Sequence, residues 1–188
     1  SMEYRCFAAT MEARLPSVRN SRWGNFDALR KLKAVDAMVA ALLDALPVKA
    51  DVVRIHVGGD FFNQRYFDAW LRVAALRPQT QFYAYTKSIG YWVARLANIP
   101  ANLSLNASRG GTQDHLIDEH GLKTAEVVYT EAEAAARGLP IDHDEYHAIK
   151  GTENFALLLH GTQPKGSKAA AALKALKAEG VRHSYSAK

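Results

Sequence analysis

The residues best suited to chemistry stand where an apolar run ends. Residues 52–57 form such a run, which contains His56 and leads directly into Gly58, Gly59 and Asp60. A carboxylate at the end of a buried strand can accept a hydrogen bond from a ligand amine, base or sugar, or act as a general acid or base. Asp60 and His56 are therefore the candidate catalytic residues.

Other apolar runs also end in polar residues. Because the carboxyl ends of parallel strands meet at one edge of a sheet, ligands of α/β folds bind there. The donors and positive charges at these ends predict a pocket for an anionic or hydrogen-bonding ligand. Its candidate ligand-binding residues are Gly58, Gly59, Lys87, Ser88, Asn106, Ser108, Arg109, His160, Gly161, Gln163, Lys165, Gly166 and Ser167.

Many of these residue types also form turns and helix caps. Gly58 and Gly59 can simply make a turn, and Asp60 and Ser88 can each cap the helix that follows. For any single residue both interpretations stay open. Polar residues at the ends of all five apolar runs favour a site.

The segment "HGTQPKGSK" resembles a phosphate-binding loop without matching one. Gly161 and Gly166 have the required spacing, but Ser167 and Lys168 stand in swapped order, so nucleoside triphosphate chemistry is not predicted. A glycine loop that opens a helix still exposes backbone N–H groups to an anion. Anion binding and an ordinary turn therefore both remain open here.

Histidines four residues apart suggest a metal site only superficially. "HDEYH" places His143 and His147 at this spacing, but a zincin helix requires glutamate directly after the first histidine, and Asp144 stands there. A solvated polar loop is the better interpretation. We predict no metal site.

Composition indicates a globular protein with a mildly basic balance of charge. The chain has 188 residues, of which 48% are hydrophobic, and its 24 Lys and Arg against 19 Asp and Glu give a net charge of +5. This balance fits nucleic acid partners or, equally, a mildly basic solvated surface. Cys6 is the single cysteine, which excludes an internal disulfide and suits the cytoplasm. No apolar run is long enough for a membrane helix, so no membrane partner is predicted.

The order of the elements predicts the fold class. Residues 1–25 are an Arg-rich irregular segment, and apolar residues at helical spacing predict one long helix from about residue 25 to residue 46. Five predicted strands then alternate with helices, at residues 52–57, 81–85, 102–108, 125–130 and 155–160. The alternation predicts a single α/β domain over residues 1–188, with a mainly parallel sheet, open or closed into a partial barrel.

Aromatic residues are predicted mainly in the core. By periodicity these are Phe7, Trp23, Trp70, Phe82, Tyr83 and Trp92. Phe61 and Phe62 follow the glycine turn, where one of them could stack on a nucleobase. Core burial is expected for at least one of the pair.

Three blocks of the sequence, residues 5–29, 54–88 and 102–109, resemble the phage and mobile-element family known as gene product 88. "Cys6-Phe7-Ala8", residues 16–18, the strand end from His56 to Asp60 and the strand end from Tyr83 to Lys87 fall on elements typical of that family. The resemblance covers about the first 110 residues well. It implies a phage or mobile-element accessory protein, in the host cytoplasm if phage-encoded.

The central block also resembles radical S-adenosylmethionine enzymes, which have a partial (β/α) barrel. Gly58-Gly59-Asp60 occupies the place of their Gly-Gly-Glu-Pro strand end, and Cys6 could correspond to the last cluster cysteine. Their [4Fe–4S] cluster needs three protein thiolates, and this chain has one. Unless an upstream segment supplies more cysteines, the resemblance therefore implies no radical chemistry and no cofactor.

Three functional hypotheses follow. The first is a phage accessory protein that binds nucleic acid or a nucleotide-like anion at the strand ends without catalysis. The second is a transferase or hydrolase acting on a nucleotide or nucleic acid, with Asp60 as acid or base. The third is a module that binds a host protein and retains the pocket as a relic.

Overall fold

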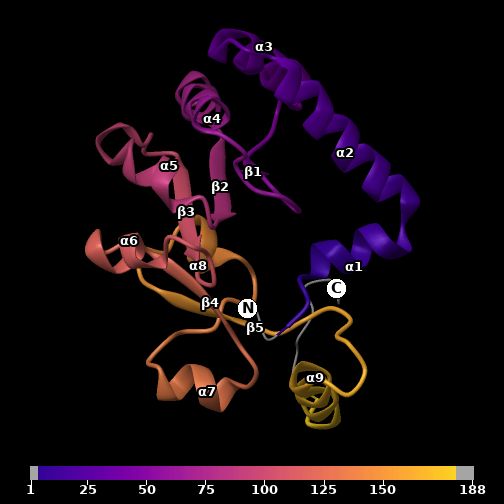
Figure 1. Cartoon of the computed structure of the whole chain (residues 1–188). Coiled ribbons are helices and arrows are strands. Elements are labelled where there is room, and N and C mark those ends of the chain that lie inside the picture. The colour runs from indigo at the N-terminus through magenta and orange to yellow at the C-terminus, as the bar shows by residue number, and fades with distance from the viewer. Residues whose placement is uncertain (1–3, 181–188) are drawn as a thin grey trace.

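A computed structural model of the chain describes residues 4–180, which are built around a sheet of five parallel strands (Figure 1). The sheet curls into an open half-barrel with α4–α7 around its outer side. This confirms the predicted α/β class with a parallel sheet and a partial barrel. The strands pair in chain order and are β1 (Val52–Arg54), β2 (Gln81–Thr86), β3 (Leu103–Ser108), β4 (Thr124–Val128) and β5 (Phe155–Leu158).

Each connection between strands contains a helix. These are α4 (Gln64–Leu76), α5 (Ile89–Val93) with the 3₁₀ turn η1 (Leu96–Asn98), α6 (Asp114–Glu119), α7 (Glu131–Ala136) and α8 (Tyr146–Ile149), and α9 (Lys168–Ala178) follows β5. Asn63, Thr130 and Ser167 cap α4, α7 and α9, each accepting a hydrogen bond from the backbone N–H three residues on. Helix α8 arises in a stretch predicted to have no regular structure, and it packs against β2 and β3.

The prediction of an irregular N-terminal segment was wrong. Helix α1 (Phe7–Arg14) and helix α2 (Pro16–Lys31) occupy most of it, with Pro16 at the first position of α2. Proline suits that position because its missing N–H would have no intrahelical partner. Helix α2 has no buried residue, so the apolar period that normally reveals a helix is weak.

The long helix predicted from residue 25 to residue 46 is two helices. Helix α2 ends at Lys31 and α3 (Val35–Ala45) begins after Ala34, because Leu32 and Ala34 have extended backbones. The break frees α3 to bury Met38, Val39 and Leu42 against α4. It leaves α2 as an exposed arm that extends from α3 toward α1 (Figure 1).

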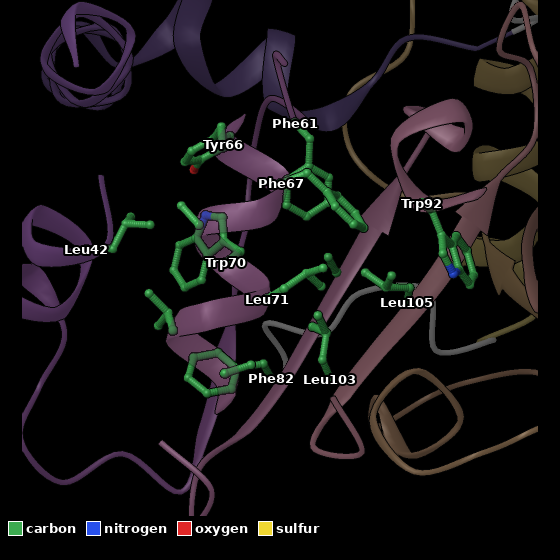
Figure 2. Close-up of a cluster of buried hydrophobic side chains, with 14 of the residues drawn as sticks. Leu42, Phe61, Tyr66, Phe67, Trp70, Leu71, Phe82, Trp92, Leu103 and Leu105 are labelled. Carbon is green, nitrogen blue, oxygen red and sulfur yellow. The ribbon is translucent and has the colours of Figure 1, made fainter. Parts of the chain in front are cut away.

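The main core fills the space between α3, α4, α5 and the outer face of the sheet. Helix α4 buries one apolar face that includes Phe67, Trp70 and Leu71, and alternate sheet residues such as Phe82 and Leu105 face it (Figure 2). The inner face of the sheet is covered separately, with Tyr83, Ala125 and Phe155 packed on Ala148 of α8. Burial of Trp70, Phe82, Tyr83 and Trp92 confirms those core predictions, while the Phe7 side chain lies outside the described part.

Strand β1 is shorter than predicted. Ile55 N–H still donates to Tyr83 O, at 2.9 Å, but regular pairing ends at Arg54. The His56 carbonyl then accepts a hydrogen bond from Arg54 Nε, at 3.0 Å, and the chain turns through Gly59, whose φ is +88°. The glycine pair therefore marks the point where the chain leaves the sheet.

Helices long and apolar enough to span a membrane are absent from residues 4–180.

Candidate functional site

Asp60 links the carboxyl ends of β1 and β2. Its carboxylate accepts hydrogen bonds from Phe61 N–H at 2.7 Å, from the Thr86 hydroxyl at 2.6 Å and from Lys87 N–H at 2.7 Å. Helix α4 is capped by Asn63 instead, so the capping interpretation of Asp60 was wrong. Because both carboxylate oxygens already hold protein donors, the arrangement suits positioning of the two loops better than proton transfer.

Thr86 and Ser88 extend the link. The Thr86 hydroxyl, which donates to Asp60, accepts a hydrogen bond from Ser88 N–H at 2.9 Å. The Ser88 hydroxyl donates to the Phe61 carbonyl at 2.8 Å, so it ties the two loops and does not cap α5. Thr86 was not among the predicted site residues, because threonine is also an ordinary strand residue.

Lys87 links the ends of β2 and β3. Its ammonium group donates to the Ser108 carbonyl at 3.0 Å, to the Ser108 hydroxyl at 3.2 Å and to the Arg109 carbonyl. Burial lowers the pKa of Lys87, and the nearby acidic groups Asp114 and Asp60 oppose this shift. Asp60, Thr86, Ser88, Lys87 and Ser108 therefore form one hydrogen-bonded set, which we call the tip network.

Two predicted members at β3 lie outside the tip network. Asn106 is fully buried and its amide donates to the carbonyls of Ala84, at 3.2 Å, and Ala148, at 3.1 Å, which places it beneath the mouth of the half-barrel. The Arg109 side chain pairs with Asp118 at 2.6 Å and with Glu126 at 3.3 Å. Its guanidinium is therefore paired with carboxylates of α6 and β4.

The loop after β5 is tied to the N-terminal segment. Gln163 is buried, accepts a hydrogen bond from Arg5 N–H at 2.7 Å and donates to the Arg5 carbonyl at 3.1 Å and to the His160 carbonyl at 3.2 Å. Gly161 and Gly166 have positive φ, Ser167 caps α9 and Lys165 is exposed. Binding of an anion by this loop stays a prediction.

Helix α1 lies across the carboxyl end of the half-barrel. Both contacts come from its first turn: on one side, the Thr10 hydroxyl donates to the Thr162 carbonyl beyond β5, at 3.4 Å. On the other side, Ala8 lies beside Gly58, where a Cβ atom would be only 3.1 Å from the Ala8 Cβ. The predicted single mouth is thus bridged by the chain's own N-terminal helix.

Arg22 of α2 holds this bridge in place. Its guanidinium donates to the Ala8 carbonyl at 3.2 Å and pairs with Glu12 at 3.1 Å. It also lies over Gly58, where a Cβ would meet Arg22 Nη1 at 2.7 Å. Gly58 therefore permits a close approach between the turn after β1 and the arm.

A large cleft opens beside the tip network, between α2, α3 and the loop from β1 to α4. Its volume is about 920 Å³, within the range of small-ligand sites. We call it the aromatic cleft, because its wall includes Trp23, Phe26, Phe62, Tyr66 and Trp70; Leu29, Leu42 and Ile55 add apolar surface. Of the predicted site residues, His56, Gly58, Gly59 and Asp60 line it.

His56 belongs to the wall of the aromatic cleft. Its Nε2 lies 3.2 Å from the Tyr66 hydroxyl, and its ring meets Phe61 edge-on at 4.7 Å. Burial lowers the pKa of His56 to about 4, although the Asp60 carboxylate opposes the shift. The imidazole is therefore neutral at pH 7 and supports the wall by packing and one hydrogen bond.

Trp23 lies on the surface and not in the core. It was predicted in the core, but its side chain is 55% exposed on α2, at the cleft. Phe61 is buried and Phe62 is partly buried at the cleft, as expected for a pair of which at least one enters the core. The apolar character of tryptophan favoured burial, but whether Trp23 is covered depends on the paths of α2 and α3, which its residue type does not show.

Metal-ligating groups do not gather in the described part of the chain: it has no cluster of three His, Cys, Asp or Glu side chains suited to an ion. His143 is exposed, and His147 lies 3.4 Å from Glu153.

Fold and site define the class: an α/β half-barrel with cross-linked strand ends and an N-terminal helical arm that forms an aromatic cleft. The family model described as Gene product 88 matches residues 2–179. The chain therefore belongs to the Gene product 88 family, which confirms the resemblance noted in its sequence.

A curated relative comes from a bacteriophage. The Gene 88 protein of Mycobacterium phage L5 is 36% identical to this chain over 90 residues. The match covers 44% of this chain and 38% of the relative, so the chain spans about two fifths of that protein's length. No solved structure matches the chain.

Proposed function

We propose that this phage-family protein binds nucleic acid, and that the arm formed by α1 and α2 makes the main contact. The observation that carries the proposal is an uneven distribution of charge. Residues 4–33 contain seven Lys and Arg against two Asp and Glu, whereas residues 114–145 contain two against nine. A basic segment of this kind attracts phosphates and releases their counterions.

At least four of the seven cations in residues 4–33 are both accessible and unpaired within the part of the chain that the structure describes. Arg14, Arg19, Lys31 and Lys33 are exposed, and none of them forms an ion pair with another of residues 4–180. A cation without a protein partner can contact phosphate without first losing a stabilising interaction. The arm thus supplies the positive charge that the predicted strand-end pocket was expected to supply.

Binding without catalysis accounts for the hydrogen bonds of Asp60 and for the exposed cations better than an enzymatic role of Asp60 does. The second hypothesis needs Asp60 to exchange a proton with a ligand, but its oxygens hold three protein donors. The strand-end residues then keep the half-barrel and the arm in fixed positions, and the ligand lies against the arm and the aromatic cleft. We retain the anionic ligand of the first hypothesis and move its site toward α2.

The test is the binding of fluorescein-labelled DNA and RNA, followed by anisotropy at increasing salt. The double variant Arg14→Ala, Arg19→Ala is compared with the charge-matched control Lys174→Ala, Lys177→Ala on α9, whose side chains are also exposed. We expect Arg14→Ala, Arg19→Ala to weaken binding and to reduce the magnitude of the negative slope of log K against log salt by about 1.4 for single strands. The control pair should change the affinity and the slope little.

Two results would overturn the proposal. One is the absence of binding to single-stranded DNA, duplex DNA and RNA at about 50 mM salt, where electrostatic binding is strong. The other is an equal loss from both double variants, which would indicate attraction by net charge alone. A host protein retained from lysate after nuclease treatment, together with the first result, would favour the host-protein hypothesis.

A further inference from the structure

We infer that the nucleic acid is single-stranded and that one unpaired base enters the aromatic cleft. This inference rests on the proposed function and names the class of nucleic acid. It depends on two features of the molecule that a purely electrostatic surface would not need: the order of side chains along α2, and the shape and lining of the cleft beside it.

Two cations flank two aromatic rings along one stripe of α2. Arg19, Trp23, Phe26 and Arg30 have spacings of four, three and four residues, which places them on one face of the helix. The stripe is about 16 Å long, and Arg30 lies over the Phe26 ring at 5.4 Å. A single strand presents unpaired bases beside its phosphates, and proteins bind it through such a combination of cations and rings.

Trp23 is the accessible ring of the stripe. The residue is 55% exposed, and its ring meets Phe26 edge-on at 5.8 Å, so Phe26 does not stack on the indole. Together with the other rings of the aromatic cleft, the indole forms a contiguous apolar surface, which is the kind of surface that marks an interaction site. A nucleobase offers a flat surface of matching character, whatever its sequence.

The aromatic cleft continues from Trp23 into the protein. Phe26 meets Phe62 edge-on at 5.2 Å, and Phe62 stacks on Tyr66 at 4.5 Å, which together form an aromatic wall. Leu29 and Ile55 add apolar surface, and Arg22 and Asn25 supply polar groups. At about 920 Å³ the cleft has room for a base with its sugar.

Duplex DNA cannot use this cleft without losing a base pair. Its bases are stacked and paired, so filling the cleft would require one nucleotide to be flipped out at a cost of a few kcal/mol. A single strand has no such cost. Duplex is therefore expected to contact only the cations of the arm.

The experiment compares a fluorescein-labelled oligo(dT) of about 15 nucleotides with a duplex of the same length, since single-strand sites reach about 16 nucleotides. Trp23→Ala removes the stacking ring. Ala41→Phe projects a ring into the cleft from an exposed position on α3. Tyr146→Ala is the control, because Tyr146 is 57% exposed on α8, away from the arm.

We expect Trp23→Ala to weaken oligo(dT) binding about 5- to 100-fold and duplex binding by less than about 2-fold. Ala41→Phe should likewise remove most of the preference for single strands, and Tyr146→Ala should preserve it. Trp23→Phe should recover part of the lost affinity, which separates loss of stacking from misfolding.

Equal oligo(dT) and duplex affinities for the wild-type protein would overturn the inference. So would an unchanged preference in both Trp23→Ala and Ala41→Phe. If Arg14→Ala, Arg19→Ala still weakened both ligands in that case, nucleic acid binding by the arm would survive and the role of the cleft alone would fail. If the wild-type protein bound neither oligo(dT) nor duplex, both the proposed function and the role of the cleft would be overturned.

Discussion

The tip network and the aromatic cleft lie side by side at the end of β1, but they use their side chains in opposite ways. In the tip network, polar groups are satisfied by one another: Asp60, Thr86 and Lys87 direct their hydrogen bonds at neighbouring loops. In the cleft, rings such as Trp23 and Phe62 line open space. The first region holds the protein together, and the second is free to receive a ligand.

This difference shows that polar residues at strand ends need not form a binding site. In an open half-barrel of five strands, the loops at the carboxyl end need cross-links, and Asp60 and Lys87 supply them between successive strands. Open surface is found where helices leave the barrel layer, as α2 does. The tip network is therefore a structural region, and the aromatic cleft is the receptive region, meaning the one that can receive a ligand.

Asp60→Ala should produce the largest effect on stability. Phe61 N–H, Lys87 N–H and the Thr86 hydroxyl would lose a charged acceptor, and hydrogen bonds to charged groups contribute about 1.5–3 kcal/mol each. Because Asp60 is partly exposed and water can replace some of these bonds, we expect a loss of about 3 kcal/mol in the free energy of unfolding, measured by urea titration.

Asp60→Asn serves as the control. It preserves the shape and one acceptor oxygen, so it should lose less than Asp60→Ala. Wild-type stability in Asp60→Ala would contradict the structural role of the tip network. Unchanged stability combined with a loss of turnover on any nucleotide substrate would restore Asp60 as a catalytic residue.

Much of the barrel could be predicted because its strands are buried on both faces and α4 is buried on one. The five strands are short apolar runs, and α4 repeats Tyr66, Trp70 and Val73 at helical spacing. The arm could not be predicted in the same way. Helix α2 buries no residue, so the apolar period in its first half is weak, and no residue type marked the break at Leu32.

Parts of the candidate site were beyond sequence analysis for a related reason. The glycine pair and the aspartate predicted the turn at Gly58–Asp60. They could not show that the Thr86 hydroxyl and Lys87 N–H would donate hydrogen bonds to the Asp60 carboxylate. Nor could they show that α1 would bridge the mouth, because Gln163 and Arg5 are 158 residues apart. Such contacts are set by the folded path of the chain.

His56 allows the wall of the cleft to be tested by pH. Its folded pKa is about 4, below the ordinary value of about 6.5, so between these values the unfolded chain binds more protons. The stabilisation is complete above pH 6.5 and is lost as the pH falls toward 4. We expect a decrease of about 2 kcal/mol in the free energy of unfolding between pH 6.5 and 4.5 from this group.

The measurement is urea unfolding at several pH values, compared between the wild type and His56→Phe. The phenylalanine keeps a ring against Phe61 and cannot titrate, so its stability should fall less over the same pH range. Parallel curves for the two proteins would show that His56 is already accessible to protons in the folded state. That outcome would mean that His56 is exposed to the interior of the aromatic cleft and does not only support the wall of the cleft.

Gly58 lies where the two regions meet, and its substitution should have the smallest effect. A Cβ there would displace the guanidinium of Arg22, the flexible end of a long side chain, and would come within 3.1 Å of Ala8 Cβ. We expect Gly58→Ala to lower the free energy of unfolding by about 1 kcal/mol, at the lower end of overpacking costs. In an Arg22→Ala background the same substitution should cost less, because the displaced group is gone. A double-mutant cycle by urea titration measures this coupling. Strict additivity would mean that Arg22 does not join the arm to the strand ends, and that the cleft and the tip network are held independently.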